Sequence, residues 1–152
     1  MAHALARAQR PLIIAQRGAG SSAGFDALAA IADGWSIPVC QWWAVATAIS
    51  ADHPMYVGQE PGPWLAKADV VLVVDSLAPW MPDVHHMRDD CEVIQLGPNP
   101  LFSRFPVRNF RSDVSIATET GMGLVALATA MSELGHAPDA SVRRAAFDSP
   151  HA

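Results

Sequence analysis

The residues best suited to chemistry in this sequence lie in a glycine-rich turn near the N-terminus. The segment Arg17-Gly18-Ala19-Gly20-Ser21-Ser22-Ala23-Gly24 has the pattern G-x-G-x-x-x-G and directly follows a short apolar run. Glycines at a strand-to-helix turn let the backbone approach a ligand, and the N-terminus of the helix offers free N–H groups to a phosphate. Gly18, Ala19 and Gly20 are therefore candidate nucleotide-binding residues, although such turns also use glycine for steric reasons alone.

Two polar residues follow apolar runs later in the chain. Asp75 comes directly after Val70-Val71-Leu72-Val73-Val74, and Asn99 belongs to the Gly97-Pro98-Asn99-Pro100 turn. Both would lie at the carboxyl edge of a parallel sheet, where α/β proteins bind ligands. For Asp75 two roles remain open: contact with a ribose hydroxyl, or the role we favour, a cap on the N–H groups of the next turn.

Other kinds of catalytic or metal site find little support. Polar residues gather before the run at 92–96, but they show no C-x-x-C or H-E-x-x-H spacing; they are Asp83, His85, His86, Asp89, Asp90 and Cys91. We expect this segment to be a solvated connection. Ser21 and Ser22 lack a G-x-S-x-G motif around them, so no catalytic residue and no metal ligand is predicted.

Composition limits the class of protein. The chain has 152 residues, which suits one domain, and a net charge of -5 without any basic run. Nucleic acid and anionic membranes are therefore not expected partners. No stretch approaches the ~18 apolar residues of a membrane span, and no secretory signal is evident. Cys40 and Cys91 are expected to be buried reduced thiols, which indicates a cytoplasmic protein.

Apolar runs alternate with segments of helical periodicity. Strands are expected at 11–15, 37–41, 69–74, 92–96 and 114–117, and the main helices at 22–33 and 121–134. Ser21 or Ser22 would cap the first of these helices, and Gly34 would end it. This alternation predicts an α/β, doubly wound parallel sheet covered on both faces. The domain would span residues 11–135, between an N-terminal extension (1–10) and a C-terminal linker or tail (136–152) that starts as a helix.

Four of the five tryptophans are expected in loops or short helices near strand ends. Trp42 would begin a short helix over 42–50, and Trp43, Trp64 and Trp80 lie in loops or short helices. Indoles at such places can stack on a nucleotide base, but we favour burial at a subunit or domain interface. With only 16% charged residues, the chain is expected to self-associate, as a homodimer, through the loops that carry these indoles.

The order of several segments resembles a known family. The sequences P-L-I-I-A-Q-R-G-A-G at 11–20, I-P-V at 37–39, H-P-M-Y-V-G at 53–58, A-D-V-V-L-V-V at 68–74 and V-I-Q-L-G-P-N-P at 93–100 are similar to the central domain of thiamine-diphosphate enzymes. The group includes acetolactate synthase, pyruvate oxidase and benzoylformate decarboxylase. The resemblance covers about residues 10 to 134.

The resemblance implies a Rossmann-like, six-stranded parallel sheet that lies between two larger domains. A pyrimidine-binding domain and a pyrophosphate-binding domain would supply the chemistry, with thiamine diphosphate and Mg²⁺, in a lyase or carboligase that acts on a 2-oxo acid. This chain contains no Gly-Asp-Gly of the kind that holds the magnesium in such enzymes. It would therefore be a non-catalytic, structural domain of a homo-oligomeric enzyme.

The resemblance also bears on flavin binding. In flavin-containing members this domain binds the ADP part of FAD, with an Asp-x-Asp where this chain has Gly97-Pro98-Asn99 and a Gly-Asp where it has Ala117-Thr118. Those members carry a glycine and an arginine where this chain has the segment 75–80. Tight binding of FAD is therefore not expected. The alternative is a nucleotide-binding module for ADP, FAD, CoA or NAD that uses the Gly18–Gly20 turn.

Overall fold

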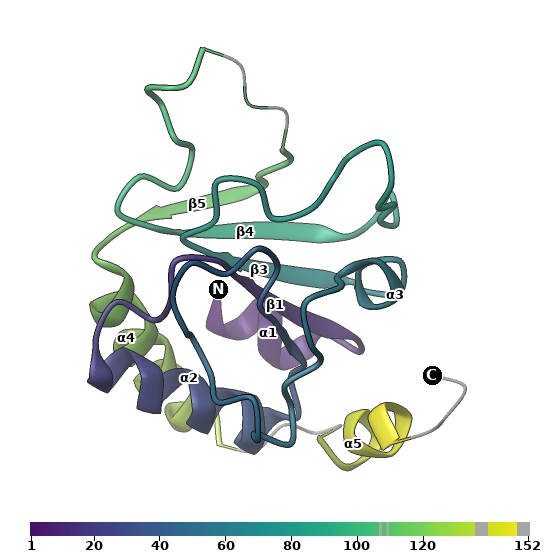
Figure 1. Cartoon of the computed structure of the whole chain (residues 1–152). Coiled ribbons are helices and arrows are strands. Elements are labelled where there is room, and N and C mark those ends of the chain that lie inside the picture. The colour runs from purple at the N-terminus through teal and green to yellow at the C-terminus, as the bar shows by residue number, and fades with distance from the viewer. Residues whose placement is uncertain (107, 109, 136–139, 149–152) are drawn as a thin grey trace.

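A parallel sheet lies at the centre of the structure, a computed structural model that describes residues 1–106, 108, 110–135 and 140–148 (Figure 1). Its strand order is β2-β1-β3-β4-β5, and all neighbours are parallel. The strands are β1 (Pro11–Ala15), β2 (Val39–Cys40), β3 (Val70–Val74), β4 (Glu92–Gly97) and β5 (Val114–Ala117). The predicted α/β class with a parallel sheet is confirmed.

A further segment pairs with the outer edge of β2. Val39 forms a parallel bridge with Tyr56; its N–H donates to the carbonyl of Met55, and its own carbonyl accepts from Val57. β2 is shorter than the predicted 37–41. The segment 55–58 thus extends the five-stranded sheet on the side of β2, in the position that a sixth strand would take.

Local signals define the helix that follows β1. In α2 (Ser22–Trp35) the N-cap is Ser21, whose Oγ accepts a hydrogen bond from the N–H of Gly24 at 3.0 Å, as predicted. The helix ends two residues later than expected, because Ser36 and not Gly34 takes the left-handed conformation, with a φ of 50°.

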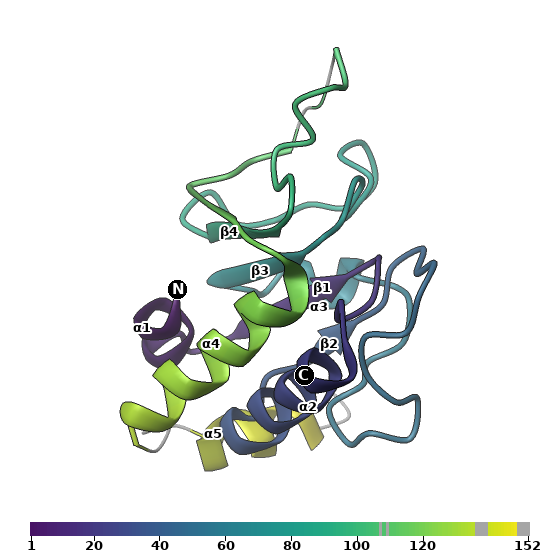
Figure 2. The same cartoon turned by 90° about the vertical axis from the view of Figure 1, so that its left-hand side faces the viewer.

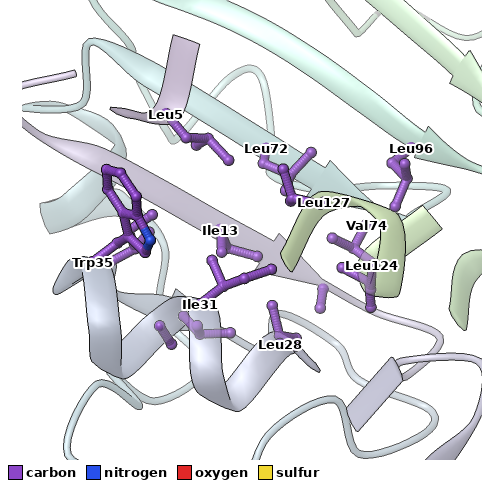
Figure 3. Close-up of a cluster of buried hydrophobic side chains, with 14 of the residues drawn as sticks. Leu5, Ile13, Leu28, Ile31, Trp35, Leu72, Val74, Leu96, Leu124 and Leu127 are labelled. Atoms are coloured by element: carbon purple, nitrogen blue, oxygen red, sulfur yellow. The ribbon is translucent and has the colours of Figure 1, made fainter. Parts of the chain in front are cut away.

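Helices cover one face of the sheet. The α1 (Ala2–Arg7), α2 and α4 (Thr120–Glu133) helices pack there, and α2 and α4 lie side by side (Figures 1 and 2). Side chains alternate along each strand, so every second residue of β1, β3 and β4 enters this core. Figure 3 shows Ile13, Leu72, Val74 and Leu96 meeting Leu28, Ile31, Leu124 and Leu127 of the helices.

The opposite face is covered by the short α3 (Gly62–Leu65) and by loops. The other strand residues, such as Leu12, Ile14 and Val73, pack there against Trp42, Leu65 and Trp80. The predicted helix at 42–50 is not formed. Its backbone bonds instead to the side chain of Gln41, which accepts from the N–H of Ala48 at 2.6 Å and donates to the carbonyl of Ile49 at 3.2 Å.

The two terminal helices are linked by one arginine. Arg143 of α5 (Ala140–Asp148) is buried and donates to the carbonyl oxygens of Trp35 at 3.1 Å and of Leu5 at 3.2 Å, at the ends of α2 and α1. Figure 2 shows α5 next to α2. Residues 136–139 and 149–152 of the predicted linker lie outside the described residues. No helix in the described part of the chain is both long and apolar enough to cross a bilayer.

Candidate functional site at the carboxyl edge of the sheet

The order in which the chain adds strands to the sheet reverses at β1. From β1 the chain crosses to β2 on one side, and it later enters β3 on the other side of β1. In open α/β sheets, ligands bind in the crevice outside the carboxyl ends of the strands at such a point. The Gly18–Gly20 turn follows β1 and Asp75 follows β3, so both lie near this crevice.

The glycine turn lines a cleft of about 440 Å³. Gly18 and Gly20 both have a φ of +78°, a conformation that L side chains rarely adopt, so the turn needs glycine at these positions. Arg17 and Asp26 contribute opposite charges to the walls, whose other members are Gly18, Ala19, Gly20, Ser21, Ser22, Phe25, Ala46 and Thr47. Of the predicted site, Gly18, Ala19 and Gly20 line this cleft, and Asp75 and Asn99 do not.

Helix packing explains the glycine spacing more directly than a ligand does. A Cβ on Gly20 would lie 2.5 Å from the backbone nitrogen of Gly121, and a Cβ on Gly24 would lie 2.8 Å from the Cα of Gly121. The start of α2 therefore touches the start of α4, and no side chain fits between them. The signal that sequence reasoning missed is the second glycine pair, Gly121 and Gly123, at the start of α4.

A carboxylate lies against the same turn. Glu119 caps α4, and its two oxygens accept from the N–H groups of Gly121 at 2.9 Å and Met122 at 2.7 Å. These hydrogen bonds lower the pKa of Glu119. A Cβ on Gly20 would lie only 2.6 Å from Glu119 Oε1. The turn is thus next to a negative charge, which disfavours a phosphate there.

Asp75 does not form the cap that we favoured. Its φ is +39°, and among the described residues none donates a hydrogen bond to its carboxylate. The N–H of Leu77 donates instead to Gln16 Oε1 at 2.9 Å. Burial raises the pKa of Asp75, and the positive charge of Arg17 partly opposes that effect. Gln16, which follows β1, was not recognised from the sequence because a lone glutamine carries no motif.

An aromatic ring packs against arginines that lie near the ends of β1 and β3. Phe102 is 5% exposed, and its ring lies under two guanidinium groups, those of Arg17 and Arg108, each 5.1 Å from the ring centroid. Arg108 also donates to the carbonyls of Ser76 at 3.1 Å and Leu77 at 3.2 Å, directly after β3. Arg17 and Arg108 therefore tie the connection after β4 to the segments that follow β1 and β3.

The side chain of Asn99 forms hydrogen bonds within its own loop. Its Oδ1 accepts from the N–H of Ser103 at 3.2 Å, and the side chain is exposed. It belongs to the connection that carries Phe102, but it does not meet Gly18, Gly20 or Asp75. The five predicted site residues therefore divide between the cleft, the strand end and the loop.

The histidine and acid segment is only partly the solvated connection that we expected. Asp83, His86, Asp89 and Asp90 are exposed, whereas His85 is buried. His85 Nδ1 accepts from the N–H of Met81 at 3.1 Å, and its Nε2 lies 2.9 Å from Glu60 Oε1. Within the described part of the chain, no group of three or more His, Cys, Asp or Glu side chains could hold a metal ion.

The tryptophans differ in their surroundings. Trp42 and Trp80, which are 9% and 4% exposed, belong to the core on the α3 face. The expectation that they serve an interface is therefore wrong for these two side chains. Trp64 is half-buried against the same core. Trp43 remains 55% exposed.

The two cysteines are reduced and buried on the α3 face of the sheet. Burial raises the pKa of Cys40 to about 12 and that of Cys91 to about 11. Such thiols are poor nucleophiles and poor metal ligands. The prediction of buried reduced thiols is confirmed.

Comparisons with known proteins agree with this architecture. The model of the family described as "Thiamine pyrophosphate enzyme, central domain" matches residues 1–127. A solved structure from Mycobacterium smegmatis, described as that of a thiamin diphosphate-dependent enzyme, aligns with a TM-score of 0.69 at 21% identity, over 91% of this chain and 27% of that chain. Benzoylformate decarboxylase from Polynucleobacter necessarius aligns with a TM-score of 0.68 at 17% identity, over 84% and 25%. No curated protein sequence matches significantly. The chain spans about a quarter of each of these two solved chains.

Proposed function

Because the chain belongs to the family of thiamine pyrophosphate enzyme central domains, we propose that it is a non-catalytic, structural domain of an acetolactate synthase-like enzyme. The complete enzyme would be a homo-oligomeric lyase or carboligase that acts on a 2-oxo acid. Its reacting groups would lie in neighbouring pyrimidine- and pyrophosphate-binding domains. The buried, reduced Cys40 and Cys91 fit the reducing cytoplasm as its location.

The described residues do not fit the coenzyme's metal. They present no cluster of carboxylates, histidines or cysteines that could hold Mg²⁺. Thiamine diphosphate and its magnesium would therefore be bound by the neighbouring domains, and no step of the reaction is assigned to this chain. Its role would be to hold those domains at a fixed separation.

One observation carries the structural role: Phe102 packs against two arginines beside the ends of β1 and β3, close to the place where a sheet of this kind binds nucleotides. Its ring is buried beneath Arg17 and Arg108, so these two guanidinium groups near β1 and β3 already have a partner. A phosphate that paired with either arginine would have to disturb these cation–π contacts. This supports a domain that binds no nucleotide at the switch point.

The cleft beside the glycine turn favours a second candidate function. Its volume of about 440 Å³ falls in the usual range for small-molecule sites. A nucleotide-binding module for ADP, FAD, CoA or NAD would use Gly18, Ala19 and Gly20 there, with Asp75 and Asn99 as more distant contacts. The carboxylate of Glu119 beside the turn argues against a phosphate in this cleft.

Thermal unfolding with added nucleotides separates the two functions. We expect ADP, FAD, CoA and NADH at about 1 mM to leave the melting temperature unchanged. Binding would be easy to detect, because a ligand at 100 times its Kd adds about 2.7 kcal/mol to the free energy of unfolding. A clear rise with any of them, abolished by Gly20→Val in a variant that still folds, would favour the nucleotide-binding module.

The catalytic part of the proposal needs a separate assay. With thiamine diphosphate and Mg²⁺ added, the chain alone should release no CO₂ from pyruvate or benzoylformate. Activity should appear only in the complete enzyme that contains the neighbouring domains. Turnover by the isolated chain would contradict a purely structural role.

A further inference from the structure

An exposed pair of stacked indoles lies on the loop after β2. The rings of Trp42 and Trp43 are 4.9 Å apart and nearly parallel, at 15°. Trp42 is the inner ring, and the outer ring of Trp43 stays largely in solvent beside Val45, which is 77% exposed. We call Trp42, Trp43 and Val45 the tryptophan platform.

The inner ring of the platform packs against the buried side chain of His85. Trp42 meets the ring of His85 edge-on at 5.1 Å and 79°. His85 is fixed in turn by the N–H of Met81 and by Glu60, and Glu60 Oε1 also accepts from the N–H of Gly62 at 3.0 Å. The inner ring therefore cannot swing freely, and it supports Trp43 as a fixed flat surface.

The backbone at Trp43 has a positive φ. Trp43 has a φ of 48°, which is uncommon for a bulky side chain. Residues in such conformations gather at functional surfaces, where the surrounding structure maintains the strain. The isolated chain gains little from this arrangement, because the outer face of Trp43 contacts water.

Acidic and apolar groups lie on the segments that are connected to the platform through His85. The carboxylate of Glu60 contacts the ring of His85. Asp83 and Val84 are exposed in the 81–85 turn, where the same ring accepts a hydrogen bond from the N–H of Met81. Arg17 forms a backbone bridge with Ala46, and its guanidinium packs over the ring of Phe102. The surface thus combines an exposed indole face with negative charge.

We propose that the tryptophan platform is the docking surface for a neighbouring domain of the thiamine diphosphate enzyme, which presents an apolar side chain flanked by arginine or lysine. This inference rests on the proposed function. A cation beside the apolar side chain would pair with Asp83 or Glu60 and could lie over the indole face of Trp43.

A second copy of this chain fits the platform less well. A two-fold contact places the same surface of both copies together, which would bring Asp83 and Glu60 close to their own copies. The solved structures with this fold extend over about four times its length, because the aligned part covers 27% and 25% of them. A complete enzyme of that length would contain other domains, which could cover the platform.

Site-specific photo-crosslinking in the cells from which the gene comes tests the proposal. A benzophenone amino acid replaces Val45, and the joined peptide is identified by mass spectrometry. We expect a peptide from a thiamine diphosphate-binding domain, in the same polypeptide or in another. The yield should fall several-fold with Trp43→Ala or Asp83→Lys, but not with Asp52→Lys, which changes an exposed carboxylate of the 50–54 turn.

The matched control places the same crosslinker at Met122, an exposed side chain on α4. A joined peptide from a second copy of this chain, or no adduct at all from position 45, would overturn the proposal. A thiamine diphosphate-binding domain captured only from position 122 would overturn the platform and leave the proposed function intact. Its absence at both positions would count against both.

Discussion

At the turn after β1, the backbone of Gly20 lies so close to α4 that no side chain fits. We expect Gly20→Ala to lower the free energy of unfolding by more than the about 1–2 kcal/mol that a left-handed conformation costs an L-residue, because the new Cβ would also meet the backbone nitrogen of Gly121 at 2.5 Å. Urea denaturation measures the loss.

Two other glycines separate the cost of the left-handed conformation from the cost of the clash with α4. Gly58 has a φ of +84° but open space around it, so Gly58→Ala should show the conformational cost alone. Gly34 lies inside α2 with open space, and Gly34→Ala should raise stability by up to about 1 kcal/mol. Equal losses for Gly20→Ala and Gly58→Ala would show that α4 can move away.

Asp75 and Glu119 should give opposite responses to pH. Burial raises the folded-state pKa of Asp75, so between its unfolded value of about 3.9 and that raised value the native state binds more protons and loses stability as pH rises. We expect the stability of Asp75→Asn relative to the parent to increase as pH rises from about 4. Urea titrations at several pH values measure this difference.

For Glu119 the sign is reversed. Backbone hydrogen bonds lower its folded-state pKa, so its stabilising effect is present above the unfolded value of about 4.3 and disappears as the pH falls through the folded value. The advantage of the parent over Glu119→Gln should shrink in acid. A parallel response of the two variants would contradict these assignments.

At the scale of elements, Arg143 joins three helices. It donates to backbone carbonyls at the ends of α1 and α2, and hydrogen bonds to a charged group contribute about 1.5–3 kcal/mol. Arg143→Ala should therefore release α5 and speed amide hydrogen exchange in α5 and at the end of α1. Hydrogen exchange with mass spectrometry reads both segments.

The neighbouring arginine provides the control. Arg144 forms a surface ion pair with Asp33 at 2.8 Å, and such pairs contribute at most about 1 kcal/mol. Arg144→Ala should leave exchange at the end of α1 unchanged. If Arg143→Ala behaves in the same way, the buried contacts of Arg143 do not hold α5.

The sheet could be predicted because its signal is local. The five apolar runs and the Ser21 cap lie in short segments, and each reports its own structure. The segment 42–50 has the composition of a helix, yet the side chain of Gln41 binds its backbone and holds it as a loop. The docking of α5 depends on carbonyls more than one hundred positions away, which no local pattern reveals.

The candidate site was harder to predict than the fold. The glycine turn was recognisable, but its purpose depends on Gly121 and Glu119 of a distant helix. Phe102 carries no motif, and its position near the end of β3 depends on Arg108, which contacts its ring and binds the carbonyls after β3. Contacts between distant segments, which a single sequence does not display, therefore decide the surroundings of the glycine turn and of the end of β3.

At the scale of the whole molecule, the two cores share the same strands. Alternate residues of β3 enter opposite cores, so neither core can open without disturbing the strand that supports the other. We expect tryptophan fluorescence and far-ultraviolet circular dichroism to report one coincident unfolding transition in urea. Two separated transitions would show that the loop-covered face melts independently.

The reactivity of Cys40 and Cys91 can report how often the loop-covered face opens. Both thiols lie on the loop-covered face, and burial suppresses their reactive thiolate form. An alkylating reagent can therefore label them only while that face is open, so the labelling rate at saturating reagent equals the rate of opening. Native protein mixed with iodoacetamide would thus record, without denaturant, how often the covering loops lift away from the sheet.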